Sequence, residues 1–332
     1  MKCIHLEIPE DFDTSMRLDQ YIALTSEDMN RSKLKACCTE LLLNGKNAKF
    51  SSKVKANDKI DLSLEDNIPE NIEPENIPLR IVYEDENIIV INKAQGMVTH
   101  PALGNWNGTL VNALLYHNGL SAIPQTKDVG ENQILKLRRP GIVHRLDKDT
   151  SGLIITAKNR DIEDFLSSQF KDRKVQKEYI CIVQGRPPAS SGDVKTQIVR
   201  DPKNRQKFKA VTATTEGKFA RSLYHCIACY GSYSIMRVRI KTGRTHQIRV
   251  HMRYLGCPIL GDSLYGKPDP LFPNATLMLH SRQMIIKISP QSKYKRFTAK
   301  IPFRFMETVR ILREKFPREV MPKVKEKCKK LK

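Results

Sequence analysis

Apolar residues along this chain recur with two different periods, which predicts both strands and helices. Ile88–Ile91 is a short apolar run followed by a turn, and Tyr179–Val183 is another. Met236–Ile240 alternates apolar residues with Arg237 and Arg239. We expect all three segments to be strands, the last of them half exposed with a basic outer face.

Other segments have the spacing of helices. Ile162–Phe170 places its large apolar residues on one helical face, and Thr109–Tyr116 has a similar spacing. A third helix is expected to be capped by Thr245 and to stop at Gly256. The mixture predicts an α+β fold dominated by a mixed, largely antiparallel sheet.

The length of 332 residues suggests two domains. Residues 65–78 are acidic and contain three prolines, which predicts a semi-extended linker. We therefore expect a small α/β domain at 1–64 and a larger domain at 79–313. The lysine-rich residues 314–332 are expected to form a disordered tail or a frayed helix.

The small domain is predicted to contain two short helices followed by a small sheet. The second helix is expected to include Leu41 and Leu42, and Asn44-Gly45 is a turn signal. The basic residues of this domain can gather on one surface, although a solvated helix face would have the same composition. They are Arg17, Arg31, Lys33, Lys35, Lys46 and Lys53.

The net charge narrows the choice of partners. The chain has 57 Lys and Arg against 36 Asp and Glu, a formal charge of +21, which favours a nucleic-acid partner over a merely well-solvated surface. No apolar run approaches the roughly 18 residues of a membrane-spanning helix. Met1–Phe12 lacks the apolar core of a signal peptide. We expect a cytoplasmic protein with no membrane partner and with reduced thiols.

One cysteine pair has the spacing of a metal or redox motif. Cys226 and Cys229 lie in a segment that resembles a strand, where positions three apart point to opposite faces. No second pair completes a tetrahedral site. We interpret both as packing cysteines and expect no metal.

The most informative segment is Arg139–Lys158. Its apolar runs Ile142-Val143 and Leu153–Ile155 flank a polar stretch, so that stretch is expected to connect two buried strands. Asp147 within it has cationic neighbours that favour an ionised carboxylate, able to act as a nucleophile or to stabilise positive charge at a sugar carbon. A turn-forming role is the alternative for Asp147, and it is the interpretation for Asp149.

This segment closely resembles the active-site motif of the RluA-type pseudouridine synthases, H-R-L-D-x-x-T-S-G. Further segments that are similar to the family follow in the expected order: Asn92–Pro101, Lys177–Tyr179, Gly243–Arg249, Leu260–Gly266 and Leu279–Ser281. The resemblance implies the pseudouridine synthase fold and the conversion of uridine to pseudouridine in RNA. The product is an isomer, so no cofactor is expected.

The resemblance also implies roles for individual residues. Asp147 would be catalytic, Arg249 would pair with it and keep it ionised, and Tyr179 would pack against the target base. Arg145 would fill the space left by a flipped nucleotide, or it is a structural ion-pair partner. The other residues expected at the substrate are Lys93, His144, Thr150, Arg244 and His246. Whether Asp147 attacks the sugar carbon or removes a sugar proton is left open.

The small domain resembles the RNA-binding αL motif, roughly over Met16–Leu64. A small domain of this kind before the larger domain is typical of members that act on large-subunit ribosomal RNA, and transfer RNA is the alternative. We expect a monomer.

Two other functions are alternatives to pseudouridine formation. A glycosidase or metal-dependent nuclease would use Asp147 and Asp149, and a non-catalytic RNA-binding or ribosome-assembly protein would need only the basic surface.

Overall fold

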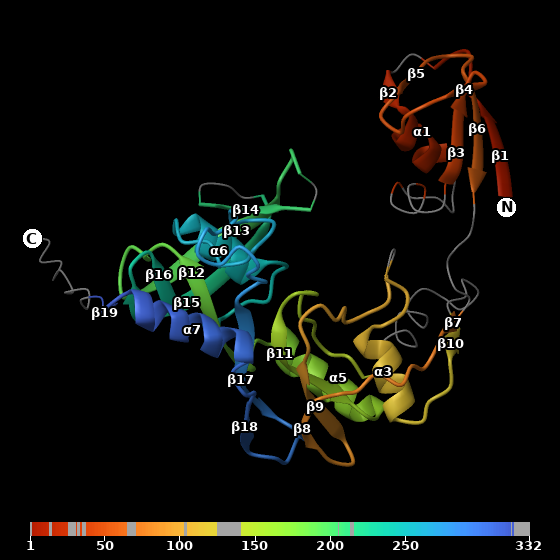
Figure 1. Ribbon diagram of the computed structural model, residues 1–332. Coiled ribbons are helices and arrows are strands. Elements are labelled where there is room, and N and C mark those ends of the chain that lie inside the picture. Colours follow the sequence, from red (N-terminus) through yellow and green to blue (C-terminus); the bar gives the residue numbers. More distant parts are fainter. Residues whose placement is uncertain are drawn as a thin grey trace, which may run out of the picture. The chain divides into compact units, whose positions relative to one another are not determined.

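The computed structural model describes residues 2–12, 15–25, 31, 34, 38–64, 71–102, 105–124, 141–204, 206–212, 216–319 and 321. The chain divides into two compact units (Figure 1). The smaller unit is built mainly from the first 73 residues, and the larger unit holds most of the chain from Pro74 onward.

The smaller unit is an antiparallel sheet with one described helix beside it. The sheet has the order β1-β6-β3-β4, with β1 Lys2–Glu7, β6 Lys59–Leu64, β3 Cys38–Leu43 and β4 Lys46–Asn47. Two short pairs accompany it: β2 (Met16–Arg17) with β5 (Lys53–Val54), and β7 (Asn71–Ile72) with β10 (Ile123–Pro124). Helix α1 (Leu18–Thr25) buries Leu18, Tyr21 and Ile22 against this sheet's apolar residues.

One helix prediction in this unit is wrong. Leu41 and Leu42 lie in strand β3, where they pair with Leu62 and Asp61 of β6. The apolar run Leu41–Leu43 is too short for its spacing to distinguish a helix from a strand. The turn that follows it favours a strand. Asn44 and Gly45 both have positive φ, 53° and 73°, the backbone of a tight hairpin turn into β4.

Buried Asp19 joins two parts of the smaller unit. Its carboxylate accepts hydrogen bonds from Arg17 (3.0 and 3.2 Å) and from Arg31 (2.6 Å). Burial alone would raise the pKa of Asp19, but the two guanidinium groups lower it overall. The Arg-Leu-Asp and Arg-Ser segments are therefore tied together by a buried ion pair.

The larger unit is built on an eleven-stranded sheet (Figure 1). Nine strands follow in the order β14 (Phe208–Val211), β13 (Ser191–Arg200), β15 (Lys218–Tyr230), β16 (Tyr233–Ile240), β12 (Gln176–Gln184), β17 (Leu279–Lys287), β11 (Ser151–Ala157), β9 (Ile88–Lys93) and β8 (Ile81–Glu84). β18 (Tyr294–Thr298) pairs with β17, and β19 (Arg318–Glu319) pairs with β15. Every pairing is antiparallel except that of β11 with β17. The predicted α+β class is confirmed.

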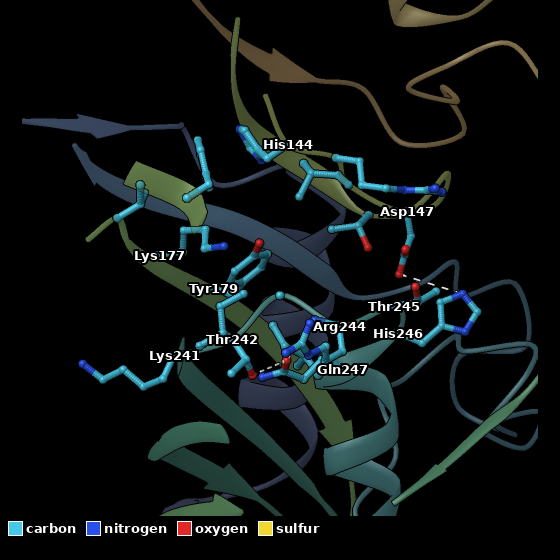
Figure 2. Close-up of a pocket in the computed structure, with 18 of the residues that line it drawn as sticks. His144, Asp147, Lys177, Tyr179, Lys241, Thr242, Arg244, Thr245, His246 and Gln247 are labelled. Atoms are coloured by element: carbon cyan, nitrogen blue, oxygen red, sulfur yellow. Dashed lines mark hydrogen bonds and ion pairs between the residues drawn. The ribbon is translucent and has the colours of Figure 1, made fainter. Parts of the chain in front are cut away.

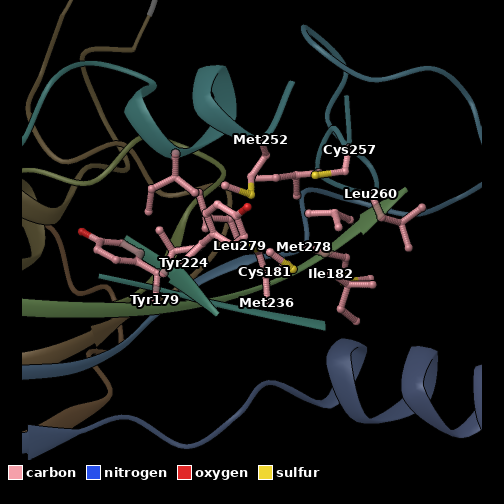
Figure 3. Close-up of a cluster of buried hydrophobic side chains, with 14 of the residues drawn as sticks. Tyr179, Cys181, Ile182, Tyr224, Met236, Met252, Cys257, Leu260, Met278 and Leu279 are labelled. Carbon is pink, nitrogen blue, oxygen red and sulfur yellow. The ribbon is translucent and has the colours of Figure 1, made fainter. Parts of the chain in front are cut away.

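The helices among the described residues of this unit are α3 (Leu110–His117), α5 (Arg160–Lys171), α6 (Gln247–Tyr254) and α7 (Phe303–Lys315). Figure 3 shows α6, which carries Met252, on one face of the sheet and α7 on the other. The sheet between them contributes Cys181 and Met236 to the largest buried cluster. No helix in the described ranges is long and apolar enough to span a bilayer.

Most of the predicted elements of the larger unit are confirmed, but two local predictions are wrong. Helix α6 begins at Gln247, and its N-cap is His246, not Thr245. His246 has φ 55° and makes no side-chain capping bond, so a preference for threonine at caps could not reveal it. Ile142, expected in a strand, makes only an isolated bridge to Thr156.

The cysteine pair departs from the expected geometry. A bulge between Cys226 and Ala228 shifts the register of β15, and the two thiols lie 3.5 Å apart instead of on opposite faces. Both cysteines are buried in the largest cluster. The alternation of a regular strand therefore fails at this position.

Two segments expected to be irregular are partly structured. Asn71–Ile72 of the predicted linker forms β7, and the backbone NH of Glu75 donates to the carbonyl of Asn112. Glu319, placed in the expected tail, lies in β19 and makes a two-bonded ion pair with Arg186 at 2.7 Å. Short-range composition does not reveal these pairings, because their partners are distant in sequence.

Gly152 allows β11 to approach β17 directly after the polar stretch that carries Asp147. Its φ is +115°, and a Cβ at this position would lie 2.3 Å from the backbone oxygen of Ser281 and 2.5 Å from its nitrogen. Neither backbone atom can move aside without disturbing the parallel pairing of the two strands. This explains the glycine of the Thr-Ser-Gly sequence in physical terms.

Gly152→Ala is expected to destabilise the chain by about 3 kcal/mol, because it combines a disfavoured backbone conformation with a backbone clash. Gly256→Ala is the matched control. Gly256 also has positive φ (+78°), but a Cβ there would meet nothing within 4 Å, so we expect about 1 kcal/mol. Urea unfolding followed by circular dichroism measures both, and equal losses for the two variants would contradict the close-approach explanation.

Candidate active site

A cavity of about 560 Å³ opens in the larger unit (Figure 2). Its walls come from the stretch before β11, the end of α5, the start of β12 and the turn between β16 and α6. Eight of the nine predicted site residues line it: His144, Arg145, Asp147, Thr150, Tyr179, Arg244, His246 and Arg249. Residues separated by about a hundred positions in the sequence are thus brought into one pocket.

Asp147 lies on a tight turn at the edge of this cavity. The backbone NH of Thr150 donates to the Asp147 carbonyl at 3.1 Å, which closes the turn and fixes the direction of the side chain. The Asp147 side chain is 21% exposed, and its Oδ2 lies 4.0 Å from both Nε2 of His246 and Nη1 of Arg249. Among the described residues that line the cavity, Asp147 is the one carboxylate.

Arg249 is held mainly by a second carboxylate, which the sequence analysis did not single out. Its Nε and Nη2 donate to the two oxygens of Asp262, both at 2.8 Å. The Asp262 side chain is fully buried and also accepts from the backbone NH groups of Leu264 and Tyr265. This bidentate pair leaves Nη1 of Arg249 as the atom that faces Asp147.

A signal for Asp262 was present in the sequence. The segment Leu260–Gly266 was noted as similar to the family, but no role was attached to its acid. Tyr265 in the same segment lies with its ring 5.2 Å from the Arg249 guanidinium carbon. Two residues of this segment, Asp262 and Tyr265, therefore contact Arg249.

His246 completes the surroundings of Asp147. Its left-handed backbone conformation places the ring between Asp147 and Tyr265, whose hydroxyl lies 2.9 Å from Nδ1. Burial lowers the pKa of His246, which the nearby Asp147 carboxylate only partly opposes. The imidazole is therefore neutral near pH 7 and offers Asp147 a hydrogen-bonding group, not a full charge.

Tyr179 and His144 form apolar parts of the pocket wall. Burial, with a smaller contribution from the Asp147 charge, raises the pKa of Tyr179, so its phenol stays protonated. His144 stacks on Phe170 with ring centroids 4.5 Å apart, and its Nε2 accepts from the backbone NH of Ile155. Burial lowers the pKa of His144 to about 3. In this structure His144 is a neutral residue of the cavity wall that packs against Phe170.

Arg244 and Lys93 are placed differently from one another. Arg244 lines the cavity while its Nε donates to the carbonyl of Phe219 at 3.0 Å. Lys93 does not line the cavity, and its Nζ donates to the carbonyls of Ala94, Met97 and Lys148 at 2.7 to 3.1 Å. The geometry gives no support to the expected contact between Lys93 and substrate. Lys93 instead joins the 94–97 turn to the Asp147 turn.

Four further cations line the cavity. The sequence analysis assigned no individual role to any of them: Lys171, Arg173, Lys177 and Lys241. Arg145 is exposed, and no described carboxylate forms an ion pair with it, so the structural ion-pair alternative has no support. A pocket lined by so many cations and one acid is suited to a polyanionic ligand.

The basic residues predicted for the smaller unit are only partly available to a ligand. Arg17 and Arg31 are engaged with Asp19, although their side chains are 42% and 28% exposed. Lys46 and Lys53 are exposed. Lys33 and Lys35 lie outside the described residues.

The sequence is similar to a known protein family and to individual proteins of several bacteria. Residues 87–254 match the family described as RNA pseudouridylate synthase. The chain is 41% identical to the ribosomal large subunit pseudouridine synthase D of Borreliella burgdorferi over 89% of each protein. It is 48% identical to an uncharacterised RNA pseudouridine synthase of Chlorobaculum parvum over 77% of each.

A solved structure agrees with these relatives. Human RNA pseudouridylate synthase domain containing 4 superposes with a TM-score of 0.53 at 25% identity, over 73% of this chain and 94% of that one. The matched family segment includes Asp147, Tyr179 and Arg249, which the structure gathers in one cavity. With both the family match and the extent of the identity, the chain belongs to the RNA pseudouridylate synthases, the enzymes that isomerise uridine in RNA.

Proposed function

We propose that this enzyme converts specific uridines of large-subunit ribosomal RNA into pseudouridine and that Asp147 is the residue that reacts at the sugar. The observation that carries the proposal is the position of Asp147, the one acid among the described residues of a cationic cavity, beside buried Tyr179. A glycosidase of the usual kind needs a second carboxylate opposite the first. Asp149 is exposed and does not line the cavity, which disfavours that alternative.

The reaction begins with access to the glycosidic bond. A uridine in structured RNA must leave its stack, at a cost of a few kcal/mol. Arg145 is exposed at the cavity and carries a flat guanidinium that can stack in the vacated space. The flipped uracil would then lie against the ring of Tyr179.

Bond exchange at the sugar follows. The C1′–N1 bond breaks, and its electron pair leaves with the uracil. The Asp147 carboxylate either bonds to C1′ and is later displaced by C5, or accepts the C2′ proton and returns it to C2′ when C5 bonds to C1′. After the uracil turns, C5 bonds to C1′, C5 loses its proton and N1 gains one. The product is an isomer of the substrate, and the carboxylate is restored.

Arg249 would act through Asp147 as a positioning residue. The bidentate pair with Asp262 keeps the guanidinium fixed, with Nη1 4.0 Å from Asp147. At this distance the guanidinium can hold the Asp147 carboxylate in place. A carboxylate so placed can react with an electron-deficient sugar carbon.

The names of relatives and the smaller unit support the ribosomal target. The Borreliella relative, called a large-subunit enzyme, aligns over 89% of this chain. We propose residues 1–64 as an αL-type RNA-binding module, with exposed Lys46 and Lys53 among its contacts, and residues 79–313 as the catalytic domain. The lysine-rich 314–332 segment would add non-specific affinity for RNA.

Asp147→Asn is expected to lower the rate of pseudouridine formation by at least about 10³-fold, because the amide cannot replace the carboxylate. RNA affinity should stay near that of the wild type, since phosphate contacts supply most of it. Asp149→Asn makes the same change of charge two residues away and should retain activity. Tritium release from [5-³H]uridine-labelled RNA and filter binding measure the two quantities. A wild-type rate for Asp147→Asn would contradict the assignment.

Asp262→Asn is expected to destabilise the chain by about 3 kcal/mol, because it leaves a buried guanidinium without its anion. The matched control is Asp269→Asn. Asp269 is buried as well, but its hydrogen-bond donors, Tyr233, Gln184 and two backbone NH groups, are neutral, so we expect about 1 kcal/mol. Urea unfolding separates the two cases, and a smaller loss for Asp262→Asn would show that Arg249 does not depend on this pair.

The RNA target is tested by mapping pseudouridine in cells with and without the gene. We expect loss at defined positions of large-subunit ribosomal RNA, restored by the wild-type gene and not by Asp147→Asn. Loss confined to transfer RNA would contradict the proposed target while leaving the chemistry in place.

A further inference from the structure

Lys177 lines the cavity. Neither the sequence analysis nor the proposed reaction assigns a role to this cation. It lies on β12 two residues before Tyr179, so both side chains leave the same face of the strand, about 7 Å apart along it. Figure 2 shows both projecting into the pocket. A uracil ring lying against Tyr179 would therefore have one edge within reach of the Lys177 amine.

The Lys177 amine has no anion among the described residues. Its Nζ lies 5.3 Å from the centre of the Phe170 ring, and a Cβ added at Gly243 would lie 3.5 Å from it. Glu178, the nearest acid in sequence, points to the other face of the strand and accepts from Arg239 at 2.7 Å. Burial lowers the pKa of Lys177 to about 8, so the fold tolerates a costly charge here.

The groups that face this part of the cavity do not supply the missing anion. His144 is neutral, and Asp147 is already placed between His246 and Arg249. The remaining charged groups of the cavity wall are cations from the stretch before β11, the end of α5 and the turn after β16. They are Arg145, Lys171, Arg173, Lys241 and Arg244. The anion must therefore arrive with the ligand.

A nucleotide brings two kinds of negative charge. Its phosphate is strongly hydrated and suits the exposed cations Lys171, Arg173 and Lys241. The uracil becomes an anion only when the C1′–N1 electron pair moves onto the ring, where O2 and O4 share the charge. A half-buried ammonium beside Tyr179 is suited to this second, transient charge, because partial exclusion of water strengthens its attraction.

We propose that the Lys177 ammonium donates a hydrogen bond to a carbonyl oxygen of the flipped uracil and stabilises the uracil anion while it is detached from the sugar. The inference rests on the proposed function and assigns a further substrate-contacting residue to it. No proton leaves Lys177 during the step. The electron pair of the broken C1′–N1 bond stays on the ring until C5 bonds to C1′, which cancels the ring's charge.

The test compares Lys177→Met, which keeps the length of the side chain and removes its charge, with Lys177→Arg and with the control Lys315→Met. Lys315 is exposed at the end of α7 and does not line the cavity. We expect Lys177→Met to lower kcat for pseudouridine formation by about 100-fold, the usual effect of removing one stabilising donor. KM and RNA affinity should change little, Lys177→Arg should recover part of kcat, and Lys315→Met should match the wild type.

Two further readouts separate this role from a structural one. Removing a half-buried, unpaired charge should raise the melting temperature of Lys177→Met, whereas a lysine retained for stability would lower it. The free-enzyme pKa of about 8 also predicts a pH effect. Since the ammonium is the active form, kcat/KM of the wild type should fall as pH rises through about 8, and Lys177→Met should lose this step.

The contradicting results are distinct from those for the proposed function. A wild-type kcat in Lys177→Met overturns the inference. So does a loss confined to KM and RNA affinity that grows with salt, because it would make Lys177 a phosphate contact. Failure of the proposed function would instead appear as undiminished activity in Asp147→Asn, whatever the Lys177 variants do.

Discussion

A guanidinium buried under an RNA-binding cavity needs an anion, and the whole active-site arrangement depends on how this chain supplies it. Arg249 takes its anion from Asp262, through two hydrogen bonds of 2.8 Å and in nearly complete burial. Oδ2 of Asp147 therefore lies 4.0 Å from Nη1 of Arg249. At this distance the two charges interact, but they do not form a tight ion pair. In the proposed reaction this difference matters, because a carboxylate with both oxygens engaged in a bidentate pair is a poor nucleophile, whereas Asp147 keeps its oxygens available.

The scaffold around this pair is rigid for reasons that can be traced to particular residues. Gly152 lets β11 and β17 approach where an added Cβ would meet backbone, so the turn that carries Asp147 is fixed to the centre of the sheet. Lys93 connects that turn to the 94–97 segment through three carbonyls. The cavity therefore rests on buried backbone contacts, while the residues offered to RNA, such as Arg145 and Lys241, are exposed at its edge.

Much of the fold and of the candidate site could be predicted from the sequence, wherever the signal lies in neighbouring residues or in the spacing of apolar positions. The strands at Ile88 and Met236, the helix after Thr109 and the gathering of Asp147, Tyr179 and Arg249 followed from apolar spacing and from motif order. What could not be predicted depends on long-range partners or on unusual backbone. Leu41 lies in a strand because it pairs with Leu62 of β6, which is distant in the sequence. His246 took a left-handed cap that no propensity favours, and Cys226 met Cys229 through a bulge. The three carbonyl partners of Lys93 could not be predicted either. The sequence of a motif does not show whether its lysine faces a substrate or backbone carbonyls.

The central claim is that a flipped uridine lies in this cavity, with its sugar at Asp147 and its base between Tyr179 and Lys177. The most direct measurement is a crystal structure of the Asp147→Asn enzyme bound to an RNA stem-loop that carries the mapped target uridine. We predict C1′ of that nucleotide against the side chain of residue 147, the uracil against the Tyr179 ring and one carbonyl oxygen within hydrogen-bond distance of Lys177 Nζ. A target base still stacked in its helix, or bound elsewhere on the protein, would contradict the claim.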